Sequence, residues 1–167
     1  LLQNLRADER HGWGVRHGFT RFNPDARVPG NCDLHEGPTG SLSSLFSHTR
    51  SDGSKALFAG TNSQLYRQHP DGMWSRIATL GEGRRVVWAG LDELVFFTNA
   101  VDRPAYHVIG EAGIRQFSDM DEIGMRSAGV VTVWNGTVFF GDIEMDGLRV
   151  GCRVLWGDAT NPLLLAP

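Results

Sequence analysis

The sequence predicts an all-β domain built from short antiparallel strands that recur about every forty residues. Residues 131–142 read VTVWNGTVFFGD, in which an Asn-Gly pair separates two runs of Val, Thr, Trp and Phe. Asn-Gly accepts the positive φ values of a two-residue turn, so this stretch predicts a β-hairpin. Two further stretches have the same pattern, SLFSHTRSDGSKALFAG at 44–60 and RVVWAGLDELVFFTN at 85–99. Three copies of one hairpin indicate a repeat architecture.

The spacing of aromatic residues supports the repeat. If Phe58, Phe97 and Phe140 are equivalent, the copies are 39 and 43 residues apart. The predicted turns carry residues that adopt turn geometry at low cost, namely Asp52-Gly53, Gly90-Leu91-Asp92 and Asn135-Gly136. A period of this length with several strands in each copy is typical of a β-propeller blade.

Further strand-like segments follow each hairpin. A third segment occurs in every copy, at 64–69, 105–110 and 148–156, and a fourth in the first two copies, at 73–79 and 113–119. No stretch of ten residues has a convincing helical period. The sequence therefore predicts a β-propeller-like fold with about three four-stranded antiparallel blades, part of a larger propeller, and a β-sandwich is the alternative.

Strand positions and domain boundaries follow from this pattern. We expect residues 1–40 to form an irregular or edge segment, 41–162 the repeats, and 163–167 the start of a further blade or a tail. The clearest strands are expected at 43–48, 55–59, 64–68, 86–89, 94–98, 130–134 and 137–141. The strand phenylalanines should pack between blades, and they are Phe58, Phe96, Phe97, Phe139 and Phe140.

Composition limits the possible partners. The 167 residues carry a net charge of -3, so no global positive field would draw the chain to nucleic acid or to an acidic membrane surface. No run of eighteen apolar residues occurs, and no membrane span is expected. Cys32 and Cys152 are far apart, which suggests neither a zinc knuckle nor a disulfide framework and leaves their pairing open.

An acidic segment, GDIEMDG at 141–147, resembles the first half of an EF-hand calcium loop. Its acidic residues are Asp142, Glu144 and Asp146, but the position of the final bidentate Glu is taken by Arg153. We therefore expect an acidic turn between strands and no metal site.

Catalytic motifs are not evident. The six histidines, expected to be mostly solvated, form no i,i+4 pair, and the sequence has no GxSxG, P-loop or dinucleotide fingerprint. HPDGMW, which contains Asp71-Gly72, does not have the spacing of a sialidase turn. The arginines of the first forty residues are diluted by acidic residues, which weakens a phosphate-binding interpretation. We expect no catalytic, cofactor-binding or metal site, and no enzyme activity.

The order of several phrases resembles tailed-bacteriophage virion β-propellers of the tail-nozzle or packaged-DNA stabilisation type. The phrases are GVRHGFTRFNPDA, LFAGTNSQLYRQHPDGMWSRI, VVWAGLDELVFFTNAVDRPAYHVIG and RVLWGDATNP, and together they span most of residues 10–162. Phe97-Thr98-Asn99 with Asp102 and Pro104 matches best. The last phrase departs from the family pattern, because Trp156-Gly157-Asp158 lacks the Ser before Asp.

The resemblance implies a structural role in the virion. It implies a propeller in the nozzle or adaptor region of the tail, where copies form a ring, contact other tail or portal proteins, and surround the passage for genome DNA. A carbohydrate-binding or carbohydrate-cleaving propeller is the alternative. Leu163, Leu164 and Leu165 would supply assembly surface or begin a further blade.

Overall fold

The computed structural model describes residues 5–8, 12–15, 38, 42–158 and 160–166. The described segments contain strands and turns and no helix. Near the N-terminus, β1 (Leu5–Asp8) and β2 (Gly12–Val15) form an antiparallel hairpin. No described segment is a helix capable of crossing a lipid bilayer.

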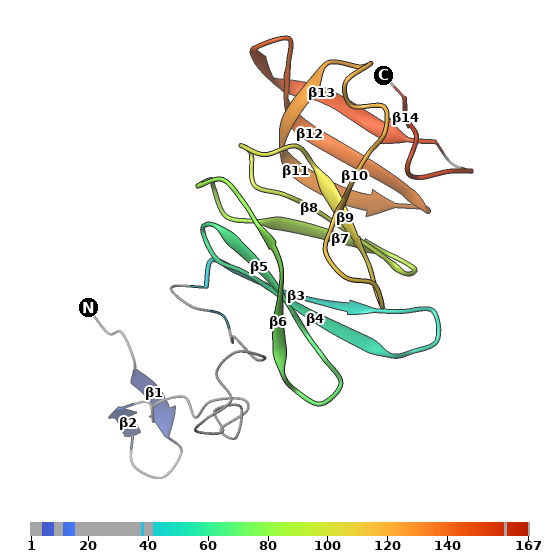
Figure 1. Ribbon diagram of the computed structural model, residues 1–167. Helices are drawn as coiled ribbons and strands as arrows, with labels where there is room; N and C mark the ends of the chain where they lie inside the picture. The colour runs from blue at the N-terminus through green and yellow to red at the C-terminus, as the bar shows by residue number, and fades with distance from the viewer. Residues whose placement is uncertain (1–4, 9–11, 16–37, 39–41, 159, 167) are drawn as a thin grey trace.

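From residue 44 onward the chain forms three four-stranded antiparallel sheets, each made of consecutive strands (Figure 1). The first sheet contains β3 (Ser44–Thr49), β4 (Lys55–Gly60), β5 (Gln64–Gln68) and β6 (Trp74–Thr79). The middle sheet contains β7 (Val87–Leu91), β8 (Leu94–Thr98), β9 (Ala105–Val108) and β10 (Arg115–Gln116). The third sheet contains β11 (Met125–Trp134), β12 (Thr137–Met145), β13 (Leu148–Gly157) and β14 (Leu165–Ala166). The all-β prediction is confirmed, and no sheet closes on itself.

The observed strands agree with the expected ones, with four main differences, one of which is that β12 ends at Met145 and not at 141. β11 begins at Met125, five residues before the expected start, because a bulge between Met125 and Ser127 lets it stay paired with β12. The second hairpin turns at Asp92-Glu93 and not at 90–92, and Asp92 takes the positive φ of 50°. Leu165 and Ala166 pair with β13 and complete the third sheet.

The middle sheet is buried on both faces, because successive side chains of a strand point to opposite sides. In β8, Leu94 and Phe96 join the cluster shared with the third sheet. Val95 and Phe97 join the clusters shared with the first sheet. β8 therefore reads as a continuous apolar run, LVFFT, because both of its faces are packed.

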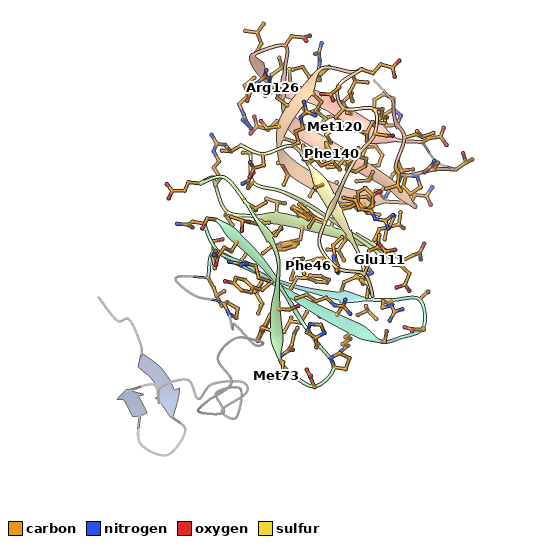
Figure 2. The ribbon with its side chains drawn as sticks, in the orientation of Figure 1. Phe46, Met73, Glu111, Met120, Arg126 and Phe140 are labelled. Atoms are coloured by element: carbon orange, nitrogen blue, oxygen red, sulfur yellow. The ribbon has the colours of Figure 1, made fainter. Side chains whose placement is uncertain are left out.

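Trp88 is the centre of the contact between the first and middle sheets. Its ring lies parallel to that of Phe46 at 6.1 Å, and it also contacts Phe58 at 5.9 Å and Phe97 at 5.7 Å. Its indole N–H donates to the hydroxyl of Ser44 at 2.9 Å, so the polar atom of this half-buried side chain is satisfied. Figure 2 shows Phe46 beside the strands of the middle sheet.

Aliphatic side chains dominate the contact between the middle and third sheets. Phe117 lies 5.9 Å from Phe96 and 5.4 Å from Phe140, and thus connects the two sheets. Figure 2 labels Phe140 within the third sheet. The buried residues around these rings include Val131, Val138, Ile143 and Leu155. At about 25 cal/mol per Å² of apolar surface removed from water, burying one such side chain contributes about 2 kcal/mol.

The strand registers define which positions are equivalent in the three sheets. Phe46 pairs with Phe58, Ala89 with Phe96, and Thr132 with Phe139, each in the first hairpin of its sheet. The same ladder continues to the third strand, where the partners are Arg67, Tyr106 and Trp156. We call this surface of each sheet its front face. In the first two sheets the front face packs on the next sheet along the chain.

This register corrects two expectations. Phe58, Phe97 and Phe140 are not equivalent, because Phe58 lies on a front face whereas Phe97 and Phe140 lie on the opposite faces of their sheets. Phe139 is half-buried on the front face of the third sheet and belongs to none of the three buried clusters. The other four strand phenylalanines are buried, as expected.

Candidate functional site

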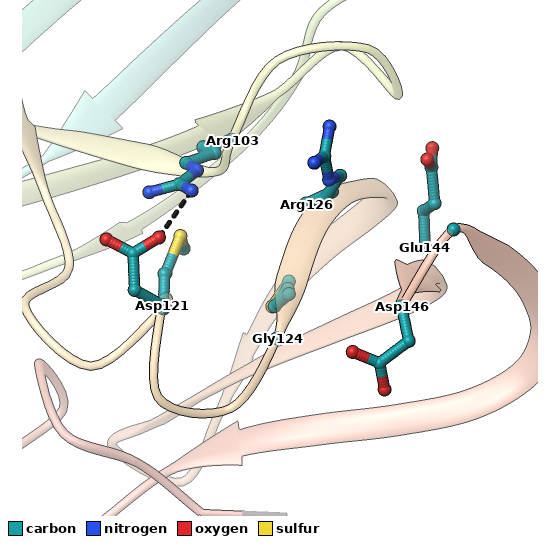
Figure 3. A pocket seen from close by; sticks show the side chains of 9 residues that line it. Arg103, Asp121, Gly124, Arg126, Glu144 and Asp146 are labelled. Atoms are coloured by element: carbon teal, nitrogen blue, oxygen red, sulfur yellow. Dashed lines mark hydrogen bonds and ion pairs between the residues drawn. The ribbon is translucent and has the colours of Figure 1, made fainter.

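A polar groove lies where the middle and third sheets meet. It encloses about 490 Å³ and is lined by Arg103, Asp121, Arg126, Glu144 and Asp146, together with backbone and Met side chains. A second hollow of about 350 Å³ shares Arg103, Arg126 and Glu144 with it. Figure 3 shows the groove from close by.

The loop between β8 and β9 positions one wall of this groove. Asn99 is buried, and its side-chain oxygen accepts hydrogen bonds from the backbone N–H groups of Val101 at 3.1 Å and Asp102 at 2.8 Å. Its side-chain amide donates to Asp102 at 2.9 Å and to the carbonyl of Gly81 at 3.2 Å. Asp102 also accepts from the N–H of Gly81 at 2.7 Å. The loop is therefore fixed to the segment that connects the first and middle sheets.

The same loop is fixed to the third sheet. Ala100 takes a positive φ of 67°, and its N–H donates to the carbonyl of Ala128 at 3.0 Å. The hydroxyl of Thr98 donates to that carbonyl as well. Arg149 donates to the carbonyl of Ala100 at 3.1 Å and to the carboxylate of Asp142 at 3.0 Å. These bonds connect all three sheets at one end of the stack.

Two arginines of the groove differ in their pairing. Arg103 forms an ion pair with Asp121, and the hydrogen bond and charge of its guanidinium lower the pKa of that carboxyl. Arg126 is exposed and has no hydrogen-bond or ion-pair partner among the described residues. Glu144, on the neighbouring strand, accepts a hydrogen bond from the buried hydroxyl of Ser127 at 3.1 Å. In Figure 3 the side chains of Arg126 and Glu144 point in the same direction.

The acidic segment at 141–147 is mostly strand. Asp142 lies at a bulge of β12, where its carboxylate pairs with Arg149 and, at 3.5 Å, with Arg84. Glu144 lies within β12, and Asp146-Gly147 alone form the turn to β13, both with positive φ. Within the described ranges no three His, Cys, Asp or Glu side chains are arranged to hold a metal ion.

The histidines in the described part of the chain have structural partners. His107 is fully buried, and its Nδ1 lies 2.7 Å from the carbonyl of Gly113. Burial lowers the pKa of His107, and the charge of Arg67 lowers it further. His48 and His69 are half-buried and bond to the carbonyl of Asp92 and the hydroxyl of Ser75. The expectation of mostly solvated histidines is therefore wrong for these three. His11, His17 and His35 lie outside the described residues.

Only one of the two cysteines lies within the described residues, so their pairing is not tested. Cys152 is an exposed free thiol in β13. Cys32 and the arginines at 10, 16, 21 and 27 lie outside the described residues. Asp71-Gly72 forms the turn between β5 and β6, where the carboxylate of Asp71 accepts from the N–H of Met73 at 2.9 Å.

Comparison of the chain with family models, with curated proteins and with solved structures gives no match. The groove was not predicted from the sequence, because its residues come from three separate loops and two strands. One part of the groove could be found from the sequence. Asn99 and Asp102, which fix the loop at its wall, belong to the phrase FTNAVDRP that the sequence analysis singled out.

Proposed function

We propose that the three sheets are consecutive blades of a β-propeller that serves as a structural, non-catalytic component of a tailed-phage virion. The observation that carries the proposal is that three consecutive four-stranded antiparallel sheets stack face to face. The first hairpins of the three sheets also pair in corresponding registers. A twisted four-stranded sheet cannot cover both of its own faces, and propeller blades solve this by stacking around an axis.

The polar groups near the groove support a structural role. Asn99, Asp102 and Arg149 use their side chains to join neighbouring sheets. Asn99 and Asp102 belong to the phrase FTNAVDRP, which is also the one that best matches the virion propellers. We infer that the phrase is shared because each such blade needs its second loop fixed to its neighbours.

A tail location would place copies of the chain in a ring that contacts other tail or portal proteins and surrounds the DNA passage. Immunogold labelling of intact phage particles with antibodies against this chain tests the location. We expect label at the tail end of the particle. Label that is absent from particles, or present only on free protein, would contradict the virion role.

The groove favours one alternative, a propeller that binds acidic sugars. Arg126 has no ion-pair partner among the described residues and lines the groove together with Arg103, so it could pair with a sugar carboxylate. Incubation of the purified chain with host surface polysaccharide distinguishes the two functions. The structural function predicts unchanged chain length and no binding, whereas binding that Arg126→Ala removes would favour the alternative.

A further inference from the structure

The front face of the third sheet is apolar and open. Four of its large side chains remain exposed, Val130 at 49%, Trp134 at 72%, Val154 at 48% and Trp156 at 42%. Isolated exposed apolar residues are ordinary, but a contiguous group on one sheet face marks an interaction surface. Two of these residues are indoles, which are enriched at the centres of interfaces.

This face corresponds position by position to faces that are already interfaces. Phe139 occupies the ladder position of Phe58 and Phe96, both of which are fully buried by the following sheet. Trp156 occupies the position of Tyr106, which is also buried. The first and middle sheets each have this face covered by the next sheet, whereas the third sheet has the same face uncovered.

The two existing contacts also define the chemistry of the partner. The middle sheet presents Val95 and Phe97 to the first sheet, and the third sheet presents Val138 and Phe140 to the middle one. The facing surface is therefore uncharged and built from aliphatic and aromatic residues at alternate strand positions. A partner sheet of the same chemistry would fit the face of Trp134 and Trp156.

A second copy of this chain matches the two existing contacts less well. In a head-to-tail arrangement it would present the outer face of its first sheet. There Ala59 and Tyr66, which pair with each other, are already fully buried. A sheet outside these three fits the open face better, and a second copy remains an outcome that the test below detects.

We propose that the front face of the third sheet packs on a fourth four-stranded antiparallel sheet of the same repeat. The inference rests on the proposed propeller and identifies the surface by which the stack continues. Thr132, Phe139 and Trp156 form the central ladder of the contact, in the positions that Ala89, Phe96 and Tyr106 hold in the preceding one.

A duplicated repeat tests the proposal. The chain is extended at its C-terminus by a second copy of residues 125–166, because that repeat presents the required surface to the middle sheet. Both native cysteines are replaced by Ser. A new thiol, Thr132→Cys in the original copy, is then alkylated, and its rate of alkylation measures how accessible the front face of the third sheet is. We expect alkylation to slow about tenfold or more in the extended chain relative to the unextended one.

Leu45→Cys is the matched control, because Leu45 is a 60% exposed strand residue on the outer face of the first sheet. Its alkylation should be equal in the two chains. Equal alkylation of Thr132→Cys in both chains would overturn the proposal, whether or not the added repeat folds. A dimer of the unextended chain in sedimentation, with Thr132→Cys already protected, would overturn it in favour of a second copy. No phage particle is involved, so the result is independent of the virion role.

Discussion

Single residues decide how closely the sheets approach, and Gly90 is the clearest case. A Cβ atom at Gly90 would lie 2.2 Å from Nδ1 of His48, whose ring is held by its bond to the carbonyl of Asp92. We expect Gly90→Ala to lower the free energy of unfolding by about 1–3 kcal/mol, because either the His48 ring must leave its hydrogen bond or the first sheet must shift. Urea denaturation measures the loss. Gly141→Ala is the control, since its Cβ would meet nothing closer than Val130 at 3.9 Å. Equal stability of the two variants would contradict the close contact.

His107 makes stability depend on pH. Its pKa is lowered in the folded protein by burial, and Arg67 and Glu111 are the charges that act on it. Its Nε2 has no hydrogen-bond partner within the part of the chain that the structure describes. As pH falls through the ordinary His range, near about 6.5, the unfolded chain takes up a proton that the folded chain does not. Stability attributed to His107 is therefore present at higher pH and decreases as pH falls.

The measurement is the free energy of unfolding at about pH 7.5 and about pH 5.5. His107→Gln should lose less stability between these values than the wild-type protein does. An identical pH dependence in His107→Gln and the wild-type protein would show that His107 does not carry the effect.

Among the elements, the loop between β8 and β9 is held by Asn99, which bonds within the loop and to Gly81 in the connection from the first sheet. Asn99→Ala removes four hydrogen bonds and leaves backbone N–H groups without their acceptor. We expect a loss of about 2–3 kcal/mol in the free energy of unfolding. Asn161→Ala, at an exposed turn where the side chain accepts from Leu163 at 3.1 Å, should cost about 1 kcal/mol or less. A loss at Asn99 no greater than at Asn161 would contradict the joining role of the loop.

The hairpins could be predicted from the sequence because their signals are local. Asn135 and Gly136 have the positive φ values that their turn requires, and alternating apolar residues flank them. The sequence predicts less well which face of a sheet each side chain occupies, because a shift of one residue moves the side chain to the other face. Trp88 and Trp134 look equivalent by spacing, yet the first is packed between sheets and the second is 72% exposed. The register that distinguishes them depends on hydrogen bonding across strands.

The groove depends on contacts that no local pattern encodes. Arg103 and Asp121 are 18 residues apart, and Arg149 reaches Ala100 across 49 residues. Such pairs form only after the middle and third sheets have stacked. The sequence could thus indicate that the phrase FTNAVDRP matters, but not that its residues join neighbouring sheets.

Residues 44–166 form a stack of sheets whose order along the chain is also their order in space (Figure 1). The first and middle sheets each use a front face, and the third leaves its own open. The proposed virion role and the proposed fourth sheet both derive from this progression.

A cryo-EM map of the phage tail that contains this chain would test both proposals together. We expect the three sheets to be neighbouring blades of a propeller, repeated in copies around the tail axis, with a fourth four-stranded sheet over Trp134 and Trp156. A map in which the sheets form a closed sandwich, or in which those two indoles face solvent in the assembled particle, would contradict it.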